Sequence, residues 1–463
     1  MIPLSELRPT RAELREMVRL ASPVVLAQVG IMMMGVVDTA MVGRVSSATI
    51  AAVALAHIYW INLTILGMGV LLVLDPVVSQ AVGARDTEGV ARGVQRGVLL
   101  ALMMSVPTAL LLIPGEFFLG VLRQPPEVTP IAATFARWSI LGVVPFYLFV
   151  VFRQSLQAMG TVRPVVIAIL VANVTNLVLN WILIYGHLGF VPMGAVGSAI
   201  STVLSRWLML AIVLYLGWRQ LRPALSPWRA ESWRLPPLWR MVSVGLPVGF
   251  QQWLEIAVFA FGAVTIGWFG AVPLAGHEIA LNLAALTFMV PMGIAAAASA
   301  MVGRAIGRQD LAAARRDAVA AVAVGFGFMS LAAVIFLAAP RALALIFVRD
   351  PATVEIAASL IWIGGLFQIF DGLQGVATGV LRGTGDTRVP MLLHLGGFWG
   401  IGIPLSLFLA FPAGMGPRGV WWGYVGSLAA VAALQLWRTR WRLAQDIQRL
   451  RIEETREYEI VSS

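Results

Sequence analysis

Three carboxylates stand inside stretches of the sequence that are otherwise apolar enough to dissolve in lipid. Asp38 lies in MMMGVVDTAMVG, Glu255 in GLPVGFQQWLEIAVFAF and Asp371 in LFQIFDGLQGVATGVLRG. A charge at the centre of a bilayer costs roughly 2.5–3.5 kcal/mol on insertion scales, so an acid in such a position is a functional-site hypothesis by default. The chemistry that a buried carboxylate offers is reversible binding of a proton or of a small hard cation.

Amide side chains accompany the first acid at helical spacing. Asn173, Asn176 and Asn180 stand at positions i, i+3 and i+7 of ANVTNLVLN, which places all three on one face of a helix. Amides in apolar surroundings need hydrogen-bond partners, and Asp38 is the partner that we expect. Thr202, in the following apolar run, is a further candidate for the same polar set.

A second polar set surrounds the other two acids. Gln251 precedes Glu255 by one helical turn, while Gln368 and Gln374 flank Asp371 at i−3 and i+3 on the same helix face. Such stripes either line a water-filled path or join helices by hydrogen bonds. We interpret them as lining a path.

Other polar residues have weaker signals. Glu278 begins a run in GHEIALN and, with Asn282 one turn later, is a second-tier cavity residue. Arg206 is deep enough in its run to require a carboxylate or carbonyl partner. The four histidines, His57, His187, His277 and His394, have no metal-ligand spacing. With no cysteine, thiolate metal sites and disulfides are excluded, and we expect no cofactor.

Composition places the acids in a membrane protein. Hydrophobic residues make up 59% of the 463 positions and charged residues 12%, about half the share of an ordinary soluble domain. A soluble enzyme is excluded on this basis. The net charge of +10 is carried by arginines that fall between apolar runs, so no nucleic-acid partner is expected. The partner is the lipid bilayer.

The apolar runs are of membrane-spanning length, which is about 20 residues. We predict twelve transmembrane helices, at 17–43, 48–78, 97–117, 131–158, 164–186, 194–217, 241–270, 272–303, 318–339, 353–381, 388–411 and 418–437. If the N-terminus is cytoplasmic, 26 of the 33 arginines lie in inside segments or at the inside ends of the helices. Because cytoplasmic segments are enriched in arginine, both termini are predicted to be cytoplasmic, in the cell inner (plasma) membrane.

The two halves of the chain repeat one another. VSQAVGARDTEGVARG at 78–93 resembles VGRAIGRQDLAAARRD at 302–317, and LQAMGTVRP at 156–164 resembles LRGTGDTRVP at 381–390, at offsets of 224 and 225. Six helices per half is an even number, which relates the halves by an axis along the membrane normal. The predicted division is an N-lobe at 1–218, a cytoplasmic linker at 219–240, a C-lobe at 241–445 and a cytoplasmic tail at 446–463.

Several motifs, in order along the whole chain, resemble the multidrug and toxic compound extrusion (MATE) transporters. They are VDTAMVGR at 37–44, NVTNLVLNWILIYG at 173–186, LNLAALTFMVPMGIAAAASAMVGRAIG at 281–307 and LFQIFDGLQGVATGVLRGTGDTR at 366–388. The pair Glu255 and Asp371 is similar to the NorM-type branch. The resemblance implies an all-α fold of two six-helix lobes around a V-shaped central cavity, and a protein that is not an enzyme.

The same resemblance implies site roles and an activity. Asp38, Glu255 and Asp371 fall on the cation-coupling acids of the family, with a sodium ion implied at Glu255 and Asp371. Family members with a well-formed N-lobe site carry aspartate where this chain has Asn180, which argues against sodium there. The implied activity is export of organic cations and drugs, hence drug resistance, driven by inward H⁺ or Na⁺, by a protein that we expect to be monomeric.

Two alternatives remain open from the sequence. A lipid-linked oligosaccharide flippase of the same superfamily would need several arginines facing its cavity to bind pyrophosphate. Only Arg206 is clearly within the membrane. A membrane-embedded enzyme such as a prenyltransferase would need acids close together for Mg²⁺, whereas Asp38, Glu255 and Asp371 are dispersed along the chain.

Overall fold

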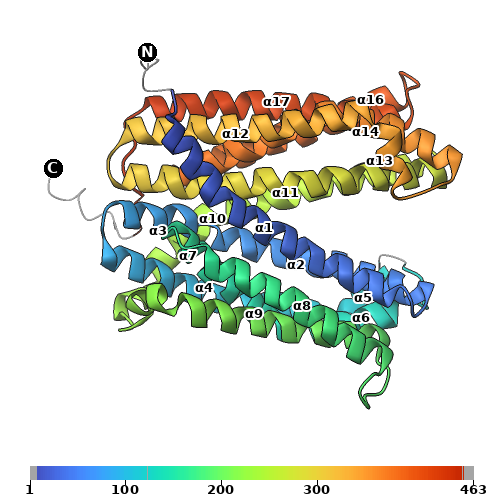
Figure 1. The fold of residues 1–463 in the computed structure, drawn as a ribbon, viewed down its shortest axis with the longest axis horizontal. Coiled ribbons are helices and arrows are strands. Elements are labelled where there is room, and N and C mark those ends of the chain that lie inside the picture. The colour runs from blue at the N-terminus through green and yellow to red at the C-terminus, as the bar shows by residue number, and fades with distance from the viewer. Residues whose placement is uncertain (1–7, 122–123, 451, 453–463) are drawn as a thin grey trace. The chain divides into compact units, whose positions relative to one another are not determined.

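The structure is a computed structural model that describes residues 8–121, 124–450 and 452. Within those residues it is built from helices, without strands, and twelve helical spans are long and apolar enough to cross a membrane (Figure 1). The all-α, twelve-span prediction is therefore confirmed. The third span begins at Thr87, ten residues before the predicted 97, because its first turns bury polar side chains such as Gln95 and Arg96 against protein.

The chain separates into two compact units, which we call the N-terminal unit, residues 26–249, and the C-terminal unit, residues 8–25 and 250–450. Two long helices, α1 (Arg11–Val42) and α10 (Leu235–Gly267), contribute one part to each unit.

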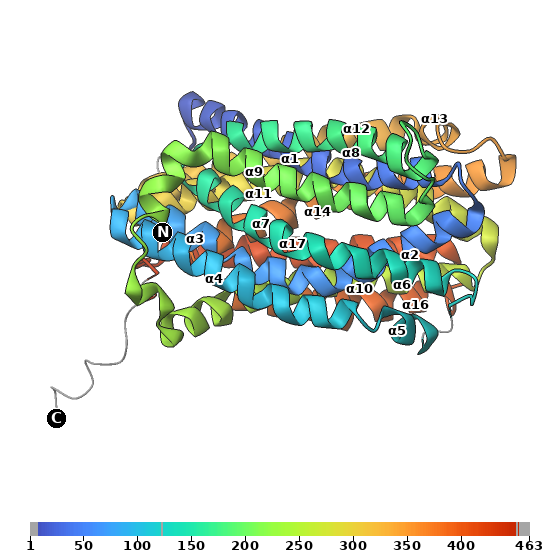
Figure 2. The same cartoon turned by 90° about the horizontal axis from the view of Figure 1, so that it is seen from below.

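The N-terminal unit contains the second part of α1 and eight further α-helices. These are α2 (Ser47–Leu71), α3 (Leu74–Gly83), α4 (Thr87–Leu112), α5 (Gly115–Val121), α6 (Thr129–Ser139), α7 (Val143–Ala158), α8 (Arg163–Tyr185) and α9 (Gly194–Leu225), followed by the first part of α10. Helices α8 and α9 run side by side, as both cartoon views show (Figure 2).

The C-terminal unit is built around α14. Its elements after α10 are α11 (Ala271–Gly307), α12 (Leu311–Ala338), α13 (Pro340–Leu345), α14 (Pro351–Gly383), α15 (Arg388–His394), a π-helical segment (Leu395–Gly402), α16 (Ile403–Ala410) and α17 (Pro417–Ala444). Helix α14 packs against α11, α12 and α17. A π-helix is rare and is frequently found at functional sites.

Glycines allow α11 and α14 to approach closely. A Cβ atom on Gly379 would lie 2.3 Å from the carbonyl oxygen of Ala295, and one on Gly383 would lie 2.7 Å from that of Ser299. Small residues four apart are the usual device for backbone contact between membrane helices. This contact fixes the position of α14, which carries Asp371.

The internal repeat has a structural counterpart at each motif. Arg85 and Gln309, 224 positions apart, both adopt positive φ angles, of 57° and 60°. The residues that follow them, Asp86 and Asp310, cap α4 and α12 by accepting hydrogen bonds from the backbone N–H groups of Gly89 and Ala313.

The second motif behaves in the same way. Gly160 and Gly385, 225 positions apart, end their helices at φ angles of 78° and 81°, where glycine is favoured because it has no Cβ. The repeat inferred from the sequence is thus a repeat of helix ends and caps.

Two connections illustrate how the helices are bounded. The predicted linker 219–240 is mostly helical, because α9 continues to Leu225 and α10 begins at Leu235. Gln95 of α4 anchors the turn between them, since its amide donates to the carbonyl groups of Ala224 and Pro227. At the start of α14, hydrogen bonds from the Thr353 hydroxyl and backbone N–H hold the pKa of the Asp350 carboxyl below its ordinary value.

Candidate functional site

Asp38 is fully buried in the N-terminal unit, and the hydrogen bonds that it accepts from the described residues come from neutral groups. Asn176 and Asn180 of α8 donate to its Oδ1 at 3.1 and 2.6 Å, and the hydroxyl of Thr202 on α9 donates to its Oδ2 at 2.7 Å. We call these four residues the Asp38 site. Each hydrogen bond to a charged group contributes about 1.5–3 kcal/mol net. Three of them therefore offset the roughly 2.5–3.5 kcal/mol that a carboxylate costs within a bilayer.

The Asp38 site also contains a hydrogen-bond acceptor that has no donor. The Oδ1 atom of Asn180 is buried and has no hydrogen-bond partner, while its Nδ2 donates to Asp38 and to Oδ1 of Asn176. A protonated Asp38 would need an acceptor for its new O–H group. Rotation of the Asn180 amide would supply one, so the site has partners for both charge states of the acid.

Asn173 lies on the same face of α8 but does not join the Asp38 site. Its amide donates to the main-chain carbonyl groups of Gly30 and Ile169, both at 2.9 Å. Gly30 precedes Asp38 by about two turns of α1, and Asn173 precedes Asn180 by a similar distance. Of the three amides predicted on this stripe, two therefore contact the acid and the third joins α8 to α1.

Two basic side chains lie beside Asp38. Nε2 of His57, on α2, is 3.8 Å from Oδ2 of Asp38, and it is buried without a hydrogen-bond partner. The guanidinium of Arg206, on α9, stacks over the ring of Trp60 at 3.9 Å from its centroid. A carboxylate or carbonyl partner was expected for Arg206. That carboxylate is Asp38, whose charge interacts with the charge of the guanidinium. The aromatic face adds cation–π stabilisation, and Nη1 of Arg206 has no hydrogen-bond partner.

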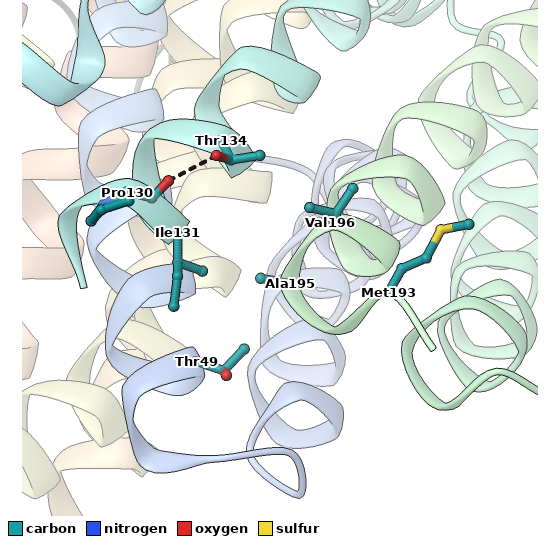
Figure 3. A pocket seen from close by; sticks show the side chains of 7 residues that line it. All are labelled: Thr49, Pro130, Ile131, Thr134, Met193, Ala195 and Val196. Carbon is teal, nitrogen blue, oxygen red and sulfur yellow. Dashed lines mark hydrogen bonds between the residues drawn. The ribbon is translucent and has the colours of Figure 1, made fainter. Parts of the chain in front are cut away.

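A surface pocket of about 380 Å³ opens where α2, α6 and α9 of the N-terminal unit begin (Figure 3). Its lining carries no charge and consists of Thr49, Pro130, Ile131, Thr134, Met193, Ala195 and Val196. None of the predicted site residues contributes to this lining.

In the C-terminal unit, a single amide joins the other two acids, which we call the acidic pair. Nε2 of Gln374 donates to Oε1 of Glu255 at 3.1 Å and to Oδ1 of Asp371 at 3.3 Å. Asp371 is buried and Glu255 is partly buried. Two carboxylates that share one donor hold a single negative charge more readily than two, because like charges repel strongly where water is scarce.

His394 is fully buried and continues this network, although its spacing from the other histidines did not select it. Its Nε2 lies 2.9 Å from Oε1 of Gln374 and 3.3 Å from Nε2 of Gln251. Its Nδ1 lies 3.0 Å from the carbonyl oxygen of Pro390 and 2.9 Å from Nε2 of Gln435.

Thr378 completes the network. Its hydroxyl donates to Oε1 of Gln435 at 2.8 Å and accepts from Nε2 of Gln251 at 3.3 Å. Three helices and α15 thus contribute side chains to one chain of hydrogen bonds that begins at the acidic pair.

Three predicted residues lie apart from this network. Gln368 on α14 accepts a hydrogen bond of 2.9 Å from Thr287 of α11. Glu278 and Asn282 of α11 are exposed, and Asn282 donates to the carbonyl of Glu278 within its own helix. Among the described residues, no hydrogen bond joins any of these three side chains to the acidic pair. In the same described residues, no three His, Asp or Glu side chains lie close enough together to hold a metal ion.

Two similar halves, each placing acids among neutral hydrogen-bond donors within membrane-spanning helices, are typical of membrane transporters. Comparison with known proteins identifies the transporter family. The MatE family model matches residues 23–182 and 247–408. The chain therefore belongs to the MatE family, as a NorM-like MATE transporter, and it is not an enzyme.

Individual relatives agree with this assignment. The chain is 37% identical over 435 residues to the multidrug resistance protein NorM of Burkholderia vietnamiensis, covering 91% of this chain and 92% of that protein. It is 36% identical over 444 residues to the probable multidrug resistance protein NorM of Mesorhizobium japonicum, covering 93% and 94%. The solved structure of the eukaryotic MATE transporter AtDTX14 has a TM-score of 0.82 at 22% identity, over 93% of this chain and 99% of that one, and so shares its fold.

Proposed function

We propose that this protein is a multidrug efflux antiporter, which exports cationic or amphipathic organic compounds in exchange for inward H⁺ or Na⁺. The printed names of its relatives, multidrug resistance proteins, support this class of substrate. The observation that carries the proposal is the surroundings of Asp38 and of the acidic pair. Among the described residues, the hydrogen bonds that these acids receive come from neutral amides and a hydroxyl. A cation can therefore compete for their negative charge, at Asp38 against the nearby His57 and Arg206.

Exchange requires a group that binds the coupling ion or the cargo, but not both. Burial penalises the charged form of a carboxylate, so an acid facing the acidic outside takes up a proton and releases it when the site rehydrates on the inside. A cationic compound is attracted to the ionised acid and expelled when the acid is neutralised. Alternating access of the two halves, with antiport by competition, follows from these properties.

The nature of the donors bears on the coupling ion. A sodium ion binds oxygen atoms, and at the acidic pair those of Glu255 and Asp371 would hold it. Gln374 presents its amide nitrogen to these carboxylates and its oxygen to His394. The pair therefore has a neutral donor suited to a carboxylate that gains and loses a proton, which favours H⁺ over Na⁺.

The magnitudes of the gradients constrain the number of ions exchanged for each exported compound. One pH unit supplies about 1.4 kcal/mol, and 100 mV supplies about 2.3 kcal/mol for each charge moved. One H⁺ exchanged for one monovalent cation moves no net charge, so only the pH difference drives it. Acids in both halves would allow two ions for each exported compound, and the membrane potential would then contribute.

The proposed orientation follows from the arginine distribution. Both termini are cytoplasmic, the protein lies in the inner membrane, and the functional unit is a monomer. In this orientation the ends of α14 at Gly383 and of α9 at Leu225 face the cytoplasm.

Purified protein in liposomes tests the proposal. One set receives a pH gradient at equal sodium, and the other a sodium gradient at equal pH, each with a fluorescent lipophilic cation as cargo. We expect one of the two gradients to drive accumulation of the cation inside the liposomes. The preference for H⁺ at the acidic pair makes this the pH gradient. Equal, slow equilibration in both sets, the same as in protein-free liposomes, would contradict antiport.

A further inference from the structure

We propose that Gln374 and His394 form a hydrogen-bond switch, in which the charge state of the acidic pair determines which nitrogen of His394 carries the proton. The inference rests on the proposed function and deepens it, because it makes His394 a positioning residue for proton exchange in the C-terminal unit.

The surroundings of His394 supply partners for either tautomer. Each ring nitrogen lies near one acceptor and one donor: Nε2 near Oε1 of Gln374 and Nε2 of Gln251, and Nδ1 near the carbonyl of Pro390 and Nε2 of Gln435. A neutral imidazole donates from one nitrogen and accepts at the other. With the proton on Nε2, His394 donates to Gln374 and accepts from Gln435. With the proton on Nδ1, it donates to Pro390 and accepts from Gln251.

Gln374 connects this choice to the acidic pair. When the pair is ionised, the amide nitrogen of Gln374 is held by Glu255 and Asp371, and its Oε1 faces His394 and requires a proton on Nε2. When a carboxyl is protonated, its O–H needs an acceptor. Rotation of the Gln374 amide by half a turn provides that acceptor, and its NH₂ then faces His394 and requires a bare Nε2.

The number of protons is conserved at His394 in both directions of the switch. The acidic pair gains one proton from water on the side to which it is open, and His394 loses one from Nε2 while gaining one on Nδ1. The net uptake is therefore the single proton on the carboxyl. No proton passes through the amide of Gln374, which only rotates.

Several charged residues stand on the helices that contribute to the network around His394. Glu255 on α10 and Asp371 on α14 are linked to it through Gln374. The other charged residues on these helices are Arg240 on α10, Glu355 and Arg382 on α14, and Arg418, Arg438, Arg440 and Arg442 on α17. Arg438 is engaged by Asp386, with 2.8 Å between its Nε and the carboxylate Oδ2. On its own segment, Arg388 lies six residues earlier. The acidic pair is joined to His394 by hydrogen bonds through Gln374.

The network extends from the pair toward one end of the unit. Asp371 lies twelve residues before the end of α14 at Gly383, which is roughly 18 Å at ~1.5 Å per residue, and Thr378 lies five residues before it, roughly 7 Å. His394 directly precedes the π-helical segment Leu395–Gly402, where the hydrogen-bonding register of the helix changes. The switch therefore stands between the acidic pair and a backbone segment with an irregular register.

Nitrogen NMR of the four histidines tests the proposal directly. Protein labelled with ¹⁵N histidine is reconstituted in nanodiscs at pH 8, and each signal is assigned with a His→Gln variant. We expect His394 to carry its proton on Nε2 in the wild type and on Nδ1 in the double variant E255Q/D371N, which mimics a neutral pair. His277, which is buried in the same unit and accepts a hydrogen bond from Trp421, should not change. An identical His394 tautomer in both proteins would overturn the proposal.

Transport provides a second readout that separates this inference from the proposed function. His394→Gln removes the two ring nitrogens that connect Gln374 to Gln435 and exchange one proton, so we expect gradient-driven transport of a lipophilic cation such as tetraphenylphosphonium to fall about tenfold. Its Kd at pH 8 should stay within about threefold of the wild type, and His277→Gln is the matched control. If His394→Gln keeps the wild-type rate and pH profile while Asp371→Asn abolishes transport, only the switch is wrong. If Asp371→Asn also transports normally, the proposed function fails.

Discussion

Asn180 donates a hydrogen bond of 2.6 Å to Asp38 across 142 positions of the chain, and it does so as a neutral amide. The bond stabilises a buried carboxylate without cancelling its charge. The same principle holds for Gln374 and the acidic pair, so both halves present acids that a cation can still neutralise.

Removal of the Asn180 amide should weaken cation binding. Asn180→Ala deletes a hydrogen bond to a charged group, worth about 1.5–3 kcal/mol, so the ionised form of Asp38 becomes harder to maintain. We expect the Kd for a lipophilic cation at pH 8 to rise tenfold or more. Asn173→Ala is the control, since Asn173 lies on the same helix face but donates to backbone carbonyls, and it should stay within about twofold. Equal Kd values for the two variants would remove Asn180 from the site.

Loss of the Gln374 amide should disable the acidic pair. Gln374→Leu leaves the two carboxylates in apolar surroundings without their shared donor, so the ionised form of the pair loses the hydrogen bonds that stabilise it. We predict a loss of gradient-driven efflux of at least tenfold, with thermal stability in detergent retained. Gln368→Leu, on the same helix but hydrogen-bonded to Thr287, should be far milder. Comparable efflux losses in these two variants would show that the effect is not specific to the pair.

The contact between α11 and α14 should tolerate no side chain. A Cβ on Gly379 would lie 2.3 Å from a backbone oxygen of Ala295, and overpacking of this kind costs about 1–3 kcal/mol. Gly379→Val should therefore lower the Tm of the purified protein. Gly327→Val on α12 is the control, because a Cβ there meets nothing within 4 Å. A Tm for Gly379→Val as high as that of the control would mean that the helices separate without cost.

The proposed orientation makes opposite predictions for two exposed positions. The chain has no cysteine, so a single introduced thiol is labelled without background. In intact cells, an impermeant maleimide should label Leu188→Cys, in the connection between α8 and α9. It should reach Ala230→Cys, in the linker before α10, only after lysis. The reverse pattern would place both termini outside.

The fold was largely predictable because membrane helices can be recognised in a sequence by their length and apolarity. The twelve runs, and the repeat carried by Asp86 and Asp310, depend on local chemistry that a sequence displays directly. The third span was placed too late because Gln95 and Arg96 are polar, and hydropathy does not reveal that the protein buries them.

The site was only partly predictable for a related reason. Helical spacing placed Asn176 and Asn180 toward Asp38 and Gln374 toward Asp371, but it could not show that Asn173 bonds to backbone. Metal-ligand spacing selects neither His57 nor His394. A histidine within an apolar run requires partners when buried, and that requirement was the signal that could have selected both.

Exchange at Asp371 is tested most directly by reconstituted Asp371→Asn beside the wild type, with equal amounts of inserted protein and the same imposed gradient. Asparagine keeps the size and polarity of the side chain but cannot gain or lose a charge. The account predicts that wild-type liposomes accumulate the lipophilic cation against its gradient and that the variant does not. Accumulation by Asp371→Asn at the wild-type rate would contradict it.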